Sequence, residues 1–294
     1  MDIKKIDRKK SSILRICRIL KKQFPERKEE FYKLGVSTEL LRHLIDNEWV
    51  NQSIFKQHAL IEKKNRKGFD FLNAEESDFI WQHRIQYLAE RVYNLKKVEN
   101  FNYLRSEILN GELVSRFAEL EVAAHLMRRN VKIKFVKPIG KKKSDYDLKI
   151  IDEVTINCEI KHKLNTTNLS FNTLKNSISR ANKQLPKNEW GIIFFKISQE
   201  WIRDVNFKKH FLRVISAFFK RNQNILGVVL RWEEQDVNFK NIFYLKYKLE
   251  QNPEIVFEKK TKQILEKING PFKSDNWVSI NEIVMKHIMK KNYR

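Results

Sequence analysis

Two apolar runs, residues 191–197 and 225–232, constrain the fold of this chain more than any other feature. Both are apolar along almost their whole length, as are strands that are covered on both faces. The residues between them, 205–222, carry apolar side chains at helical spacing. The runs are therefore expected to be strands of a sheet that has helices packed on both faces.

The segments upstream of these runs extend the same pattern. Residues 112–130 predict a helix, 131–136 a strand rich in β-branched side chains, and 147–151 and 154–161 two strands joined at Asp152-Glu153. A helix is predicted at 170–185. The order is helix, three strands, helix, strand, helix, strand. This order predicts an α/β (α+β) fold with a mixed central sheet flanked by helices.

The flanking regions have different patterns. Residues 1–111 read as an all-helical N-terminal domain that binds nucleic acid or a partner, with Ser37 as the N-cap of one helix. Residues 112–235 form the expected central domain. Residues 236–294 form an α/β extension with a strand at 241–249 and helices at 255–268 and 280–291.

Charge and cysteine content restrict the setting and the partners. The formal charge is +23 and the isoelectric point is near 9.8, which favours a polyanionic partner, nucleic acid before an anionic membrane surface. Cys17 and Cys158 form no CxxC motif, which fits a reducing cytoplasm. No apolar run approaches the roughly 18 residues that span a bilayer. A cytoplasmic protein without membrane association is expected, although charge alone does not separate a phosphate-binding face from a solvated one.

The strand at 154–161 carries the most informative polar pair. With a period of two, Glu159 and Lys161 point to one face, while Ile156 and Ile160 point to the other. The first face is expected to be polar and the second to belong to the core. Other Glu-x-Lys triplets occur in the chain, but this one ends a convincing strand. His162 should point away from Lys161, so no catalytic role is assigned to it. The bland alternative is a cross-strand ion pair.

An aspartate precedes the neighbouring strand. Asp147 adjoins the apolar run, where the sheet can fix its position, and Asp145 has the same parity nearer to the basic loop. Asp147 is preferred, Asp145 remains an alternative, and a strand-capping role is possible for either. The loop before them has a basic tip of three residues, Lys141, Lys142 and Lys143.

Two glutamates compete on the helix predicted at 112–130. Glu119 lies on a line with Val122 and Leu126, beside the stripe expected to be buried. Glu121 lies on a line with His125 that reads as solvent-facing, so it is expected to be a surface partner. A carboxylate next to a buried stripe is costly unless it is paired or bound to metal, which favours Glu119 as a functional group.

These residues, in this order, resemble the PD-(D/E)XK nuclease superfamily, which includes restriction endonucleases. The phrases that carry the resemblance are Phe117-Ala118-Glu119, Ser144-Asp145-Tyr146-Asp147-Leu148 and Cys158-Glu159-Ile160-Lys161. The phrase Ala181-Asn182-Lys183-Gln184-Leu185 is similar to one with a functional Gln in several branches. The chain has Tyr146 where the superfamily often has Pro. The resemblance covers about residues 112–232 and implies a restriction-endonuclease-like core.

The resemblance implies a role for each residue. Asp147, Glu159 and the carbonyl of Ile160 would bind Mg²⁺ or Mn²⁺, and Lys161, Glu119 and Gln184 would act in catalysis. Lys141, Lys142, Lys143 and Lys183 would contact nucleic acid. The implied activity is a metal-dependent endonuclease, acting on DNA, in restriction or phage defence, as a homodimer or in a larger complex. The alternative is a catalytically silent nucleic-acid-binding subunit of the same fold.

Overall fold

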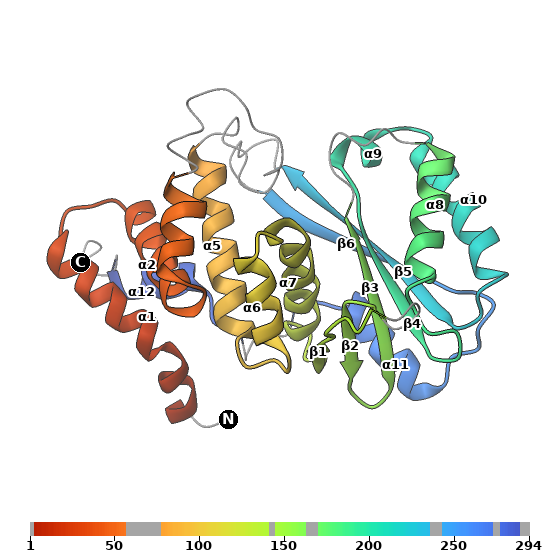
Figure 1. Cartoon of the computed structure of the whole chain (residues 1–294), viewed down its shortest axis with the longest axis horizontal. Coiled ribbons are helices and arrows are strands. Elements are labelled where there is room, and N and C mark those ends of the chain that lie inside the picture. Colours follow the sequence, from red (N-terminus) through yellow and green to blue (C-terminus); the bar gives the residue numbers. More distant parts are fainter. Residues whose placement is uncertain are drawn as a thin grey trace. The chain divides into compact units, whose positions relative to one another are not determined.

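The computed structural model describes residues 3–56, 78–140, 145–162, 170–235, 243–272 and 277–288. The chain divides into two compact units (Figure 1). A helical unit comprises Met1–Lys97, Arg105–Val114 and Asn276–Arg294, and a sheet unit comprises Val98–Leu104 and Ser115–Asp275. Each unit has its own buried apolar residues.

The helical unit is built from both ends of the chain. Its elements are α1 (Ile3–Gln23), α2 (Glu29–Leu44), α3 (Asn47–Trp49), the π-helix η1 (Val50–Lys56), α5 (Asp78–Leu95), the second part of α6 (Phe101–Leu109) and α12 (Ile280–Ile288). The prediction that Ser37 caps a helix is wrong. Ser37 is buried in the middle of α2, and its hydroxyl donates to the carbonyl of Lys33 at 2.7 Å. A serine whose hydroxyl bonds back to the preceding turn does not have to end a helix.

The sheet unit contains a six-stranded mixed sheet whose strands follow chain order. The strands are β1 (Ile133–Phe135), β2 (Leu148–Ile151), β3 (Thr155–His162), β4 (Gly191–Lys196), β5 (Ile225–Gln235) and β6 (Phe243–Gln251). Strands β3, β4 and β5 are parallel, whereas β1, β2 and β6 each run antiparallel to their neighbours. The predicted α/β class with a mixed sheet flanked by helices is confirmed, as is the order of its elements.

Helices cover both faces of this sheet (Figure 1). Helices α8 (Phe171–Asn182) and α10 (Phe207–Phe219), with α9 (Gln199–Arg203), form one apolar cluster with alternate residues of β4 and β5. Helix α7 (Leu113–Met127) contacts the opposite face, and α11 (Lys259–Asn269) packs on β6. No helix in the described ranges is long and apolar enough to cross a membrane.

The alternation predicted for β3 is correct, and the structure shows in addition that its polar face is covered. Glu159 pairs in register with Ile193, and Lys161 with Phe195, so these side chains share the α8 face of the sheet. That face is covered rather than solvated, and Glu159 is 1% exposed. The consequence is a carboxylate in the interior of the protein, next to a strand end.

Candidate metal centre

The backbone of β3 fixes the side chain of Asp147. The Asp147 N–H donates to the carbonyl of Cys158 at 3.1 Å, and the Ile160 N–H donates to Asp147 Oδ2 at 2.7 Å. Asp147 is therefore bound to β3 through its backbone and through its carboxylate. The second contact holds the carboxylate beside the Glu159-Ile160-Lys161 segment.

Glu159, Lys161 and Gln184 meet on the α8 side of the sheet. The Lys161 ammonium lies 2.6 Å from Glu159 Oε1 and donates a hydrogen bond to Gln184 Oε1. Gln184 follows the C-terminal end of α8, and its amide donates to the carbonyl of Asp145 at 3.3 Å. The residues predicted from three separate segments are thus brought together, with Gln184 joining Lys161 to the segment that carries Asp147.

The Glu159 carboxylate is the least satisfied group of the site. Both of its oxygens are buried, and neither has a hydrogen-bond partner of good geometry among the described residues. The nearby Lys161 offers charge without a well-directed hydrogen bond. A buried carboxylate in this state is costly, because it has lost water and gained few donors in return.

Glu119 is the predicted site residue that lies on α7. Its side chain is buried and forms an ion pair with Arg116, one turn earlier on the same helix. Burial raises the pKa of Glu119 well above its usual value, and the charges of Asp147 and Glu159 raise it further, while Arg116 opposes them. The charges of both strand carboxylates thus act on Glu119 in the same direction as its burial.

The two strand carboxylates also bind protons tightly. Burial raises the pKa of Asp147 to about 6, although the hydrogen bond from Ile160 and the charges of Lys161 and Arg116 act in the opposite direction. Burial and the adjacent Asp147 raise the pKa of Glu159 to about 8, against the effect of Lys161. Three acidic groups with raised pKa values, in one place, form a site where a cation would replace protons.

The donor set fits a hard cation that keeps some of its water. No group of three or more His, Cys, Asp and Glu side chains has metal-binding spacing in the part of the chain that the structure describes. Mg²⁺ is commonly bound through only one or two carboxylates, with waters completing its coordination. Asp147 and Glu159 supply two carboxylates, and Glu159 has an ion pair with Lys161 but no well-directed hydrogen bond from a described residue. Their chemistry therefore suits Mg²⁺ or Mn²⁺.

The structure describes two further predicted residues, Asp145 and Lys183. Asp145 Oδ1 accepts the Ile139 N–H at 2.9 Å, which ties its carboxylate to the preceding turn, so the geometry favours Asp147 over Asp145. Lys183 is exposed at the C-cap of α8. The nucleic-acid contacts predicted for Lys141, Lys142 and Lys143 lie outside the described residues.

The prediction that Glu121 and His125 face solvent is wrong. Glu121 is 4% exposed and His125 is 2% exposed. Glu121 forms an ion pair with Arg231 and lies 3.7 Å from the ammonium of Lys196. A helical wheel assumes that the polar side of a helix faces solvent. In α7 the polar side instead contacts charged residues of the sheet.

The sequence did contain a signal for this second cluster. Arg231 is a charged residue within an apolar run expected to be buried, and a buried charge needs a partner. His162 pairs in register with Lys196, and Lys196 with Arg231, so the three lie in one row on the α7 face. This register confirms that His162 points away from Lys161. Burial, Lys196 and Arg231 lower the pKa of His162 to about 4.

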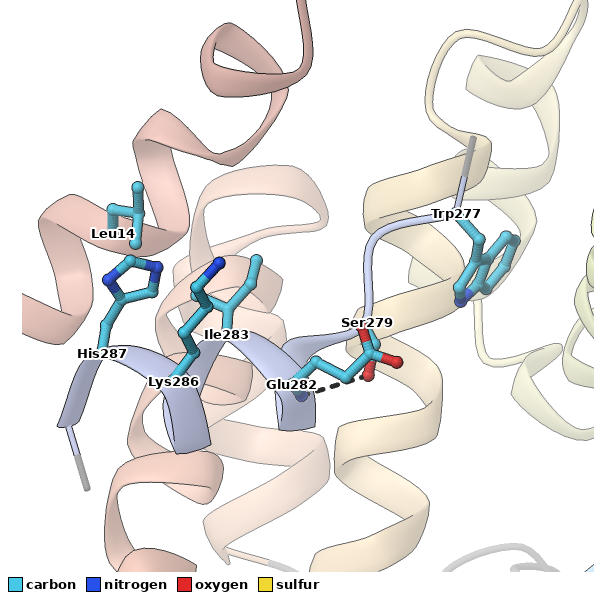
Figure 2. A pocket seen from close by; sticks show the side chains of 7 residues that line it. All are labelled: Leu14, Trp277, Ser279, Glu282, Ile283, Lys286 and His287. Atoms are coloured by element: carbon cyan, nitrogen blue, oxygen red, sulfur yellow. Dashed lines mark hydrogen bonds between the residues drawn. The ribbon is translucent and has the colours of Figure 1, made fainter. Parts of the chain in front are cut away.

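The helical unit contains a separate cavity of about 240 Å³ (Figure 2). Its lining comes from α1, from α12 and from the segment before α12, and consists of Leu14, Trp277, Ser279, Glu282, Ile283, Lys286 and His287. The Glu282 N–H donates to the Ser279 hydroxyl at 3.3 Å at the start of α12. The cavity shares no residue with the carboxylate cluster of the sheet unit.

The comparisons identify no relative of this chain. No family model matches it, and no curated protein and no solved structure shows significant similarity to it.

Proposed function

We propose that the chain is a metal-dependent nuclease that hydrolyses phosphodiester bonds in DNA. The observation that carries the proposal is the meeting of Asp147, Glu159 and Lys161 at the β2–β3 pair, with the Glu159 oxygens buried and without a well-directed hydrogen bond from any described residue. The order of elements around the site, α7, three strands, α8 and β4, agrees with the restriction-endonuclease-like core implied by the resemblance.

The chemistry follows from the charges of the site. A bound Mg²⁺ or Mn²⁺ would lower the pKa of a coordinated water and offset the negative charge that builds up on the phosphate. Asp147 and Glu159, with the Ile160 carbonyl, would bind the cation. Lys161, held by Gln184, would place its positive charge beside the attacked phosphate or orient the nucleophilic water. Glu119 would accept or hold a proton at the edge of the site.

A cleavage assay on the full chain tests this proposal. The substrates are duplex, branched and single-stranded DNA and RNA, each with Mg²⁺, with Mn²⁺ and with EDTA. We expect DNA cleavage that EDTA abolishes. Lys161→Ala should lower the rate by at least about 100-fold, because a positioned charge at the reacting group is lost.

The control is Lys134→Ala. It removes a lysine of β1 that forms an ion pair with Glu99 and is not part of the carboxylate cluster. It should cut at the wild-type rate. Nucleic acid that is bound but never cut would instead assign the chain to the silent binding class, and cleavage of RNA alone would change the substrate. Full activity in Lys161→Ala, with EDTA having no effect, would refute the proposed site.

A further inference from the structure

Arg231 is a fully buried guanidinium in β5 that directly follows the apolar residues from Ile225 to Leu230. It has 0% exposure, and its row on the sheet also contains Lys196 and His162. Its charge meets one carboxylate, Glu121, on α7. Glu121 also lies 3.7 Å from Lys196, whose ammonium is 2.6 Å from Glu233. A charged network in the interior therefore joins β4 and β5 to α7.

Arg231 contacts α7 at two points. Its Nη2 pairs with Glu121, and its Nη1 donates to the carbonyl of Ala118 at 3.2 Å. Ala118 directly precedes Glu119, so these two contacts of Arg231, which form a clamp on α7, lie on either side of Glu119. At 3.6 residues per turn, Glu119 and Glu121 project about 200° apart around the helix axis. Glu121 pairs with Arg231, whereas Glu119 pairs with Arg116 and is affected by the charges of Asp147 and Glu159.

Toward the C-terminal end of α7, the buried His125 ring hydrogen-bonds the carbonyl of Ile268 at 3.0 Å and lies 3.7 Å from the ring of Tyr247. Nearer to Glu119, the inward residues Val122 and Ala123 are buried and apolar. Apolar packing tolerates alternative arrangements, whereas a planar guanidinium with two fixed acceptors does not. A buried ion pair adds little to stability compared with apolar residues of the same size, so the directional role is the more informative one.

We propose that Arg231 and Glu121 are positioning residues that hold α7 in the rotation that brings the Glu119 carboxyl to the nuclease site. The proposal rests on the proposed function for its kinetic consequence. Its structural consequence, the location of the Glu119 carboxyl, does not depend on any activity.

Kinetics of Arg231→Met provide the first test. Methionine keeps an unbranched apolar stem of similar reach but cannot bind either acceptor on α7. We expect kcat to fall at least about tenfold while KM for DNA changes less than about threefold, as for a group that acts on the transition state. Glu121→Gln keeps an acceptor for Arg231 and should retain more activity than Arg231→Met. The control Lys267→Met breaks a 3.0 Å ion pair with Asp152 in the same unit and should leave kcat unchanged.

Titration of Glu119 provides the second test, without any substrate. In full-length protein with ¹³C-labelled glutamate carboxyls, Glu119→Gln assigns the resonance, and its pKa is compared between wild type and Arg231→Met. If α7 rotates, Glu119 leaves Asp147 and Glu159 and becomes more exposed, so its pKa should fall toward the usual value. Direct loss of a positive charge would have the opposite effect on a carboxylate.

The outcomes separate the two proposals. A wild-type protein that cuts no nucleic acid refutes the proposed function. The Glu119 titration still tests whether Arg231 and Glu121 position α7. An unchanged Glu119 titration in folded Arg231→Met refutes the clamp, even where the wild type cuts DNA. Should Arg231→Met not fold, Glu121→Lys, which opposes Arg231 with a like charge, replaces it in both measurements, and Glu121→Gln sets the reference.

Discussion

Glu159 is a carboxylate in the interior of the protein, where such a group is costly unless it is paired or bound to a metal. Its oxygens have no hydrogen-bond partner of good geometry among the described residues, and its pKa is raised to about 8. The folded chain therefore retains a proton at Glu159 that the unfolded chain releases at a lower pH. The same applies to Asp147, with a pKa of about 6. Binding of a cation at these carboxylates would therefore release protons.

The pH dependence of stability should reveal these protons. Between about pH 6.5 and 8 the folded state keeps the Glu159 proton that the unfolded state has lost, while histidines with a lowered pKa, such as His162, are neutral in both states, so the free energy of unfolding should fall as pH rises. In EDTA we expect a loss on the order of 2 kcal/mol over this range. Urea unfolding at each pH is the measurement. Glu159→Gln should have a flatter profile, whereas Glu189→Gln, at a carboxylate that is half exposed, should keep the wild-type slope.

A divalent cation should reverse this dependence of stability on pH. Metal binding requires ionised carboxylates, so stabilisation by Mn²⁺ should increase as the pH rises from 5 to 8. Thermal unfolding with and without Mn²⁺ measures it, and Asp147→Asn should reduce it strongly. A stabilisation that is equal at all pH values, or that Asp147→Asn retains, would contradict metal binding at these carboxylates.

At the scale of elements, the pairing of β5 with β6 depends on a glycine. A Cβ on Gly227 would lie 2.8 Å from the backbone carbonyl oxygen of Glu250, which the sheet cannot easily move. A Cβ on Gly191 would meet only the ends of the Ile225 and Leu185 side chains, at 2.9 and 3.0 Å. Gly227→Ala should lower the free energy of unfolding by about 1–3 kcal/mol, and Gly191→Ala by less. Equal losses in urea unfolding would contradict this view of the β5–β6 pair.

Element type and order were predictable from the sequence because residues 191–195 of β4 and 225–230 of β5 are apolar and the intervening helices have clear apolar stripes. The partners of α7 were not predictable by the same method. A helical wheel finds the apolar stripe of Val122 and Leu126 but does not know that Arg231 lies opposite Glu121. The contact joins residues 110 positions apart, which only the tertiary structure supplies.

The candidate site was likewise predictable from the sequence only in part. Strand alternation placed Glu159 and Lys161 on one face, and the register confirms it. The burial of that face depends on α8, whose position over the sheet is a long-range property. The choice between Asp145 and Asp147 also needed the structure, because the two have equal parity and differ in which backbone N–H each carboxylate accepts.

At the scale of the whole molecule, a charge of +23 should dominate association with nucleic acid. Each phosphate contact releases counterions, so affinity should fall steeply as salt rises from 50 to 200 mM, by about 10³-fold or more if six or more phosphates are contacted. The measurement uses the Asp147→Asn full chain and a fluorescent DNA duplex, so that cleavage does not interfere. An affinity that is insensitive to salt would remove the phosphate-binding interpretation of the charge.

Helix α12 has a consequence for how the protein is made. The core of the helical unit includes Ile283 and Val284 of this helix, which packs against α1 and α2, although nearly the whole sheet unit separates them in sequence. During synthesis, α1 and α2 leave the ribosome long before α12 exists. The sheet unit can therefore complete its fold first. The core that α1 and α2 share with α12 can close only after α12 has been synthesised.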